Sequence, residues 1–418
     1  MGLLPSGSIQ TSFKQSLKQT TFQACAVTRN QEESLMSNFD DIVSVGVYDT
    51  ETNLFEGQFP IPEGITYNSY VICDEKIAVM DSVDARFADQ WLSHLEDALQ
   101  GKKPDYLVIQ HMEPDHSGSI DRFMQAFPTT TLVGNAKTFT MMDNFFGTEN
   151  QSNRLIVKNG DELPLGTHTL TFVFAPMVHW PEVMMTYDNT SKVLFSADVF
   201  GTFGTAELDD AWINEARRYY FGIVAPYGKQ VQALFKKLAA YDVEALYPLH
   251  GPVLQGDIEP YKNAYQTWSS YEAEADGVTL VYSSVYGHTK QAVEKLAQMI
   301  QKHDVPVALF DLSTCVESEA IASAFRYNNL VCASLTYNGS VFPAMKTFLE
   351  ALAEKKYQNR KIAFIQNGSW APMATKAMKA ILEECKDLTF VEPEVTITGS
   401  LNDEANEQLT KLSEALIA

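Results

Sequence analysis

Two histidines and two carboxylates occur within six positions of the segment VIQHMEPDHSGSI, residues 108–120. His111, Glu113, Asp115 and His116 follow an apolar run and precede a turn of small residues. Carboxylates and imidazoles crowded in this way would repel one another or compete for water, unless a cation neutralised the carboxylates. A solvated loop gains nothing from such a sequence, so the segment predicts a metal site.

Three further candidate ligands each follow an apolar, strand-like run. They are His179 in FAPMVHWPE, Asp198 in VLFSADVFG and His250 in ALYPLHGPV. Taken singly, a packed histidine or a capping aspartate is the commoner role for such residues. Because ligands in α/β folds bind beyond the ends of the strands, a fold could bring all these loops to one sheet edge. Together with residues 111–116 they predict one metal centre.

The elements that must position these loops follow two patterns. Between about residue 40 and residue 270, short strand-like runs alternate with turns and helical stretches, which predicts an α/β sandwich of mixed sheets. From Gly277, five strands are each followed by a helical period, which predicts a complete doubly wound parallel sheet. The acidic segment SSYEAEADG marks the boundary. We expect an N-terminal extension over residues 1–35, a metal-binding domain over 36–272 and a second domain over 276–418.

The pattern HxExDH, followed by an isolated His, Asp and His, resembles the ligand set of the flavodiiron proteins, which join a metallo-β-lactamase-like αββα sandwich to a flavodoxin-like domain. The resemblance extends over nearly the whole chain after about residue 35. It implies that His111, Glu113 and His179 hold one iron, that Asp115, His116 and His250 hold the other, and that Asp198 bridges them. Glu113 stands where hydrolases of the superfamily usually have a histidine, and its anionic oxygen suits iron in two oxidation states.

Three loops of the second domain fit a bound FMN. The first contains Ser284, Tyr286, Gly287, His288 and Thr289 and leads into a helix, where backbone N–H groups and the helix N-terminus suit a terminal phosphate. The other two resemble flavin loops of flavodoxin-like domains and contain Thr336, Tyr337, Asn338 and Gly339, and then Gly368, Ser369 and Trp370. The plainer alternatives are a helix cap for Thr289 and core packing for Tyr337 and Trp370.

The resemblance implies an oxidoreductase that reduces dioxygen to water, nitric oxide to nitrous oxide, or both, at a non-haem diiron site. Electrons would pass through FMN from an external donor such as rubredoxin, within a head-to-tail homodimer or a homotetramer. Trp180, Tyr187, Phe203 and Tyr219 are candidates for setting the choice of substrate. Two other classes stay open, namely a zinc-dependent metallo-hydrolase with an electron-transfer flavin domain, and an electron-transfer flavoprotein with a vestigial metal site.

The amino-acid composition excludes several classes of binding partner. Lys and Arg total 31 against 53 Asp and Glu, and the net charge of -22 argues against nucleic acid or an anionic membrane as the main partner. The five cysteines show no CxxC spacing, so neither a cysteine-ligated metal site nor a fused rubredoxin is expected. No apolar run is long enough to span a membrane. We expect a cytoplasmic protein, with organellar targeting left open because residues 1–31 contain no Asp or Glu.

Overall fold

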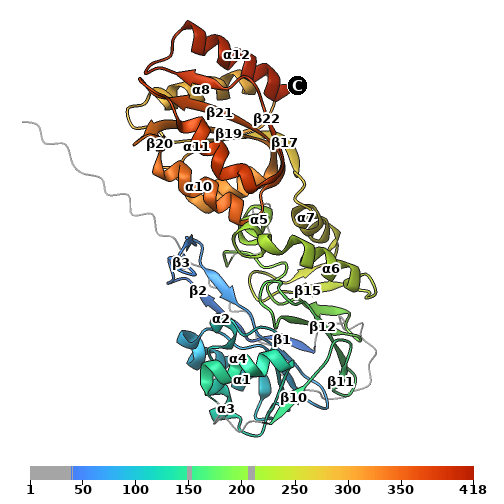
Figure 1. Cartoon of the computed structure of the whole chain (residues 1–418). Coiled ribbons are helices and arrows are strands. Elements are labelled where there is room, and N and C mark those ends of the chain that lie inside the picture. The colour runs from blue at the N-terminus through green and yellow to red at the C-terminus, as the bar shows by residue number, and fades with distance from the viewer. Residues whose placement is uncertain (1–38, 40, 148–152, 206–211) are drawn as a thin grey trace, which may run out of the picture.

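The computed structural model describes residues 39, 41–147, 153–205 and 212–418. Two lobes follow one another along the chain, the first containing strands β1 to β16 and the second strands β17 to β23 (Figure 1). The expected extension over residues 1–35 lies outside the described residues. Throughout the part of the chain that is described, helices that could cross a lipid bilayer are absent.

The first lobe is built on two six-stranded sheets. One has the order β1-β6-β7-β8-β9-β10, formed by Ile42–Ser44, Tyr70–Ile72, Ala78–Met80, Tyr106–Val108, Thr131–Gly134 and Arg154–Ile156. The other runs from β11 to β16 in chain order, formed by Glu162–Pro164, Thr169–Phe174, Met184–Asp188, Val193–Phe195, Ala245–Tyr247 and Leu254–Gln255. Two short pairs lie beside them, β2 (Val47–Asp49) with β5 (Ile65–Tyr67) and β3 (Leu54–Phe55) with β4 (Phe59–Pro60).

Strand alternation explains the layers of this lobe. Tyr70 and Ile72 of β6 belong to an apolar core shared with Phe172 of the second sheet, whereas Val71 belongs to a cluster that includes Trp91 of a helix. Because successive side chains of a strand point to opposite faces, each sheet is buried on both faces. The outer layers include α1 (Ala88–Leu99), α3 (Ile120–Ala126), α4 (Ala136–Phe146), α6 (Gly228–Leu238) and α7 (Glu259–Ser269). The expected αββα sandwich is confirmed.

The second lobe is a doubly wound sheet with the order β18-β17-β19-β21-β22, and its pairs along this order are all parallel. These strands are Val307–Asp311, Ala275–Tyr282, Tyr327–Tyr337, Gln358–Asn367 and Lys386–Phe390, and the short β20 (Ser340–Val341) pairs with β19. One face packs against α8 (His288–Gln301) and α12 (Asp403–Ile417), and the other against α9 (Glu317–Arg326), α10 (Pro343–Glu354) and α11 (Ala374–Ile381). The flavodoxin-like fold is confirmed.

The fifth strand differs from the expectation. The run VEPEVTITG forms only β23 (Val395–Ile397), which pairs with the end of β21, while the unpredicted β22 pairs with the beginning of β21. Pro393 lies between them and has no N–H to donate to a strand ladder. The expected strand is therefore shortened to the residues that follow the proline.

The two lobes meet at a buried aromatic stack. Phe221 belongs to a π-helical turn, η2 (Tyr220–Val224), which follows α5 (Trp212–Tyr219). Its ring lies parallel to that of Phe325 in α9, with 4.0 Å between the centroids and 12° between the planes. Nearby, Lys355 Nζ donates a hydrogen bond to the carbonyl of Gly222 at 3.0 Å. The flavodoxin-like lobe is thus packed against the segment that follows α5.

We expect Phe325→Ala to destabilise the protein by about 3–5 kcal/mol, because it leaves a cavity against Phe221 at a fully buried position. Urea denaturation followed by intrinsic fluorescence measures this loss. Phe390→Ala is the matched control, since Phe390 lies in the same lobe but is 40% exposed. Equal losses in the two variants would contradict a special contribution of the stack between the lobes.

Candidate functional site

The seven predicted metal ligands converge at one edge of the sandwich. His111 and Glu113 follow β8, and Asp115 and His116 lie in the short helix α2 (Pro114–Ser117). The remaining three follow strands of the second sheet, with His179 after β12, Asp198 after β14 and His250 after β15. Strands β14 and β15 are parallel, so their carboxyl ends bring Asp198 and His250 to the same edge.

One group of candidate ligands consists of His111, Glu113, His179 and Asp198. Glu113 Oε2 lies 3.2 Å from His111 Nε2 and 3.0 Å from His179 Nε2. Asp198 Oδ2 lies 3.3 Å from His111 Nε2 and 2.9 Å from His179 Nε2. Two carboxylate oxygens and two imidazole nitrogens therefore face one small volume, which can accommodate a single metal ion.

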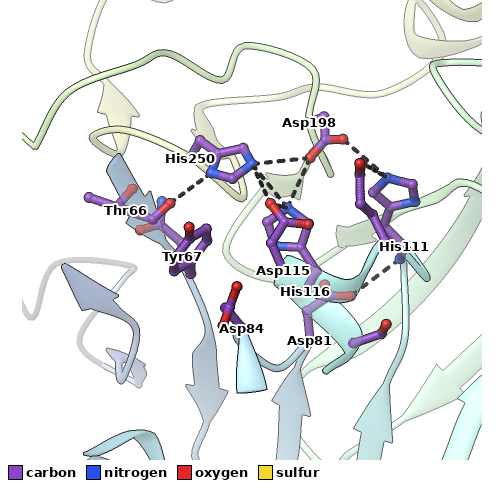
Figure 2. Close-up of polar contacts among 12 residues, drawn as sticks. Thr66, Tyr67, Asp81, Asp84, His111, Asp115, His116, Asp198 and His250 are labelled. Carbon is purple, nitrogen blue, oxygen red and sulfur yellow. Dashed lines mark hydrogen bonds and ion pairs between the residues drawn. The ribbon is translucent and has the colours of Figure 1, made fainter. Parts of the chain in front are cut away.

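A second group consists of Asp115, His116 and His250. Asp115 Oδ2 lies 3.3 Å from the Nε2 atoms of both His116 and His250, and those two nitrogens are 3.0 Å apart. Asp198 Oδ1 faces this group, 3.3 Å from His116 Nε2, while Asp198 Oδ2 faces the first group. Figure 2 shows His250, His116 and His111 pointing toward Asp198. The geometry suits two neighbouring metals that share Asp198.

The polar atoms of these groups lack ordinary partners. Both carboxylate oxygens of Asp115, Oδ1 of Asp198 and Nε2 of His179 are buried without a hydrogen-bond partner in the described residues. Burying unpaired charged groups is costly, and a bound cation would remove that cost. The donor set therefore fits a pair of metal ions, and its mixture of imidazole nitrogen with carboxylate oxygen suits non-haem iron.

The groups also shift each other's proton affinities. Burial opposes the charged form of His179, but the carboxylates of Asp198 and Glu113, 2.9 and 3.0 Å from its Nε2, outweigh burial and raise the pKa of His179 to about 9. Burial likewise opposes charge on Asp198, yet the surrounding imidazoles hold its pKa well below the usual range. Since metal ligands must be deprotonated imidazoles and carboxylates, metal binding would displace protons from this site.

Three groups that were not predicted from the sequence support the candidate ligands through hydrogen bonds, either to the ring nitrogen that faces away from the metal groups or to the neighbouring backbone. Glu182 Oε1 lies 2.8 Å from His111 Nδ1, and the carbonyl of Thr66 lies 2.7 Å from His250 Nδ1. Asp81 accepts a hydrogen bond from the backbone N–H of Gln110 at 2.7 Å. Of these three, only Glu182 has a signal in the sequence, because it lies three residues after His179. That spacing does not indicate that its partner is His111.

Aromatic rings surround the metal groups. The ring centroids of Phe55, Tyr67 and Tyr219 lie 5.4, 5.9 and 5.5 Å from that of His250. A cavity of about 390 Å³ opens beside Glu113 and Asp115, and Phe55 and Tyr67 line it together with Arg86 and Glu56. This cavity provides an approach to the metal groups that is partly aromatic and close to several carboxylates.

Of the four residues expected to influence the choice of substrate, three lie near the candidate metal site and one does not. The ring of Trp180 lies 5.2 Å from that of His111, and Phe203 packs at 5.2 Å against Tyr219, which borders His250. Tyr187 lies elsewhere, because its hydroxyl donates to the carbonyl of Asp242. Trp180, Phe203 and Tyr219 thus remain near the site, and Tyr187 is removed from consideration.

The second lobe contains a cavity of about 600 Å³ at the carboxyl ends of its parallel strands. Its lining includes ten of the predicted flavin-binding residues, namely Ser284, Tyr286, His288, Thr289, Thr336, Asn338, Gly339, Gly368, Ser369 and Trp370. The lining also includes Val285, Leu335, Asn367, Ala371, Met373 and Gly399, which sequence reasoning missed. Gly399 follows the last strand, so the rule that ligands bind at carboxyl strand ends could have found it.

Local structure at the cavity suits a phosphorylated ligand. Gly287 has a φ of 87° and immediately precedes α8, whose first N–H groups have no partner within the helix. Ser284 Oγ accepts hydrogen bonds from the N–H groups of Gly287 and Lys290, at 3.2 and 3.3 Å, which fixes the loop. The cavity thus lies at a helix N-terminus with an ordered loop, an arrangement that binds phosphate. These features fit FMN.

Two predicted flavin contacts lie outside the cavity lining. Gly287 shapes the turn before α8 instead of lining the cavity. Tyr337 is 45% exposed, and its ring packs 5.4 Å from that of Phe342. The expected stacking aromatic of the second loop is therefore turned toward its own hairpin, while Trp370 of the third loop lines the cavity and is 83% exposed.

Comparison with known proteins gives a consistent result for both lobes. Residues 65–251 match the ODP family beta lactamase, and residues 279–397 match a flavodoxin domain. The chain is 31% identical over 355 residues to an anaerobic nitric oxide reductase flavorubredoxin from Vibrio vulnificus, covering 81% of this chain and 71% of the relative. Its similarity to that protein therefore includes both lobes.

Solved structures of known proteins also match both lobes of the chain. The rubredoxin oxygen:oxidoreductase of Desulfovibrio gigas is 26% identical, with a TM-score of 0.83 and coverage of 93% of this chain and 98% of that one. A flavodiiron protein from Giardia intestinalis has the same TM-score and coverage at 24% identity, and at that identity it supports the fold alone. Both comparisons match the order of lobes described above.

Proposed function

The chain belongs to the flavodiiron protein family and is an oxidoreductase, and we propose that it reduces dioxygen to water or nitric oxide to nitrous oxide at a non-haem diiron centre. The Vibrio vulnificus relative is named as a nitric oxide reductase, and the Desulfovibrio gigas protein as an oxygen:oxidoreductase of rubredoxin. Electrons would come from a rubredoxin-type donor through FMN. In a head-to-tail homodimer or a homotetramer, the flavin of one subunit would face the metals of another.

One observation carries this proposal. Two groups of buried ligands share Asp198, and the same chain contains a separate cavity that fits FMN. A hydrolytic metal site needs no flavin, whereas reduction of a diatomic at a metal pair needs a source of electrons, which a flavin supplies. The carboxylate of Glu113 within the first group also favours iron over zinc.

Different residues of the chain would bind the two irons, surround the metal site and bind the FMN phosphate. His111, Glu113 and His179 would hold one iron, Asp115, His116 and His250 the other, and Asp198 would bridge them. When bound, two irons supply reducing equivalents and positive charge to a small diatomic. Phe55, Phe203 and Trp180 place apolar rings around the site, and the N-terminus of α8 would hold the FMN phosphate.

Tyr219 is placed to donate a hydrogen bond to the substrate. Its side chain is 1% exposed, and Asp198, Asp115 and Glu113 are near enough to influence its ionisation. Burial first, and these carboxylates second, raise the pKa of its hydroxyl well above the usual range, so the hydroxyl keeps its proton at neutral pH. Gly201 permits this approach, because a Cβ there would lie 3.2 Å from the Tyr219 ring.

We expect Tyr219→Phe to lower turnover by about 10- to 100-fold, as loss of a hydrogen bond to a charged group typically does, while iron and FMN content stay unchanged. Steady-state consumption of nitric oxide and of dioxygen measures the effect. Tyr187→Phe is the control, since Tyr187 is a largely buried tyrosine of the same lobe whose hydroxyl binds the carbonyl of Asp242. Full activity in Tyr219→Phe would remove Tyr219 from the reaction.

Metal and flavin analysis of the purified protein tests the proposed function itself. We expect iron near two atoms and FMN near one molecule per chain, and oxygen or nitric oxide consumption that depends on a reduced donor. The measurements are elemental analysis, the visible spectrum of acid-released cofactor, and electrode assays of dioxygen and, under anaerobic conditions, of nitric oxide. Zinc without flavin would overturn the proposal and favour a metallo-hydrolase.

A further inference from the structure

We propose that Glu182 is a positioning residue for one metal only, and that it makes the two halves of the centre unequal. Its carboxylate fixes the imidazole of His111 in one orientation and strengthens its donor nitrogen. This inference rests on the proposed function, since it assumes that the two ligand groups each hold a metal. Its consequence is that a change at Glu182 weakens the metal bound by His111, Glu113 and His179 before the other.

The contacts of Glu182 support this role. Its side chain is fully buried, and Oε1 lies 2.8 Å from His111 Nδ1 and 2.9 Å from the backbone nitrogen of Met112. A carboxylate can only accept in such contacts, so His111 donates from Nδ1. The lone pair of His111 Nε2 is then directed toward Glu113 and Asp198, 3.2 and 3.3 Å away. The hydrogen bond therefore selects the tautomer that a metal needs.

The charge of Glu182 adds to its geometric effect. A hydrogen bond to an ionised carboxylate is roughly twice as strong as one between neutral groups, and it raises the basicity of the donating imidazole. The other carboxylate oxygen, Oε2, has no hydrogen-bond partner in the described residues. Glu182 thus accepts two hydrogen bonds through Oε1, one from a metal-ligand imidazole and one from the adjacent backbone N–H.

The second ligand group has no equivalent support. His250 Nδ1 contacts the backbone carbonyl of Thr66 at 2.7 Å, which is a neutral acceptor. His116 Nδ1 is buried and has no hydrogen-bond partner in the described part of the chain. Of the two groups, only the one containing His111 combines a carboxylate-backed imidazole with the extra ligand charge of Glu113. The two ligand groups would therefore bind their metals with different affinities, and the two metals would differ in how easily they are reduced.

The test compares three variants of the full-length protein. Glu182→Leu removes the acceptor, and Glu182→Gln keeps an acceptor of similar shape without the charge. Asn135→Ala is the structural control, because the Asn135 side chain donates to the backbone carbonyl of Glu182 at 2.5 Å and caps α4 without contacting His111. Each protein is challenged with a graded series of an iron chelator, and the iron retained per chain is measured.

We expect Glu182→Leu to lose one of its two irons at a chelator concentration 10- to 100-fold lower than the wild type, and to retain the other iron normally. Glu182→Gln should lie between the two, and in a redox titration its two iron-reduction steps should lie closer together than in the wild type. Asn135→Ala should lower thermal stability and leave both the iron retention and the reduction steps unchanged.

Three outcomes would overturn the inference. They are unchanged iron retention in Glu182→Leu, parallel loss of both irons, or an equal weakening in Asn135→Ala, which would indicate a loosened segment and no specific effect on His111. Failure of the proposed function is recognised separately, because the wild type would then lack paired irons at the start. If the wild type holds another metal, the same challenge with that metal still tests Glu182.

Discussion

Replacing Asp198 with asparagine is expected to lower oxygen and nitric oxide consumption by about 10³-fold or more, because Asp198 is the side chain that faces both ligand groups. Its Oδ2 lies 2.9 Å from His179 Nε2 and its Oδ1 lies 3.3 Å from His116 Nε2. An amide of the same shape offers only one oxygen and no negative charge. Two neighbouring cations would then repel each other without a shared anion between them, and iron content should fall as well.

The matched control for this experiment is Asp188→Asn. Asp188 is also a buried carboxylate of the same sandwich, and its Oδ2 lies 2.7 Å from Nδ1 of the buried His168. Breaking that pair should destabilise the fold by about 3–5 kcal/mol without changing iron content per folded chain. Elemental analysis and urea denaturation of both variants separate the two effects. If Asp198→Asn kept both irons and full turnover, a bridging role for Asp198 would be wrong.

The local part of the candidate metal centre could be proposed from sequence because four of its ionisable side chains lie close together in the chain. His111, Glu113, Asp115 and His116 lie within six positions, and only a cation explains so many ionisable groups in one loop. His179 and His250 carry no such signal, since an isolated histidine after a strand is ordinary. Their roles came from the resemblance to a family, and the structure brings them to the same volume as the local cluster.

Residues that support the ligands could not be predicted, because their contacts are long-range. Glu182 lies 71 positions from His111, and the Thr66 carbonyl lies 184 positions from His250. Backbone acceptors such as Thr66 have no side-chain signature at all. Asp81 follows β7 and reaches the Gln110 backbone only because β7 and β8 are parallel neighbours. Such contacts depend on strand order and register, which hydrophobic periodicity leaves open.

Several elements differed from their sequence patterns for identifiable reasons. Helix α4 is only weakly indicated by its sequence, although Asn135 caps it by accepting from the N–H groups of Lys137 and Thr138. Its sequence, AKTFTMMDNFF, mixes β-branched and aromatic residues that are weak helix formers, so the cap was the better signal. Tertiary packing against the sheet overrides propensity here. The fifth strand is shorter than expected, because Pro393 cannot donate to a strand ladder and only Val395–Ile397 after it form β23.

Replacing Thr289 with glutamate is expected to weaken FMN binding by about 10²- to 10³-fold. Thr289 is 3% exposed and lines the cavity at the N-terminus of α8, where the phosphate of the flavin would lie. A carboxylate there competes for the helix N-terminus and repels the phosphate, and juxtaposed like charges cost several kcal/mol. Flavin retained after desalting, followed by its visible absorbance, measures the loss.

Thr289→Gln is the decisive control, because glutamine has nearly the same size as glutamate without the charge. If repulsion between anions is the cause, the glutamine variant should retain much more FMN than the glutamate variant. Both should keep the iron content of the wild type, since all seven candidate ligands belong to the other lobe. Donor-dependent turnover should therefore fall with flavin content alone. Equal FMN retention in the glutamate variant and the wild type would place the phosphate elsewhere, and loss of iron with flavin would show that the lobes do not bind their cofactors independently.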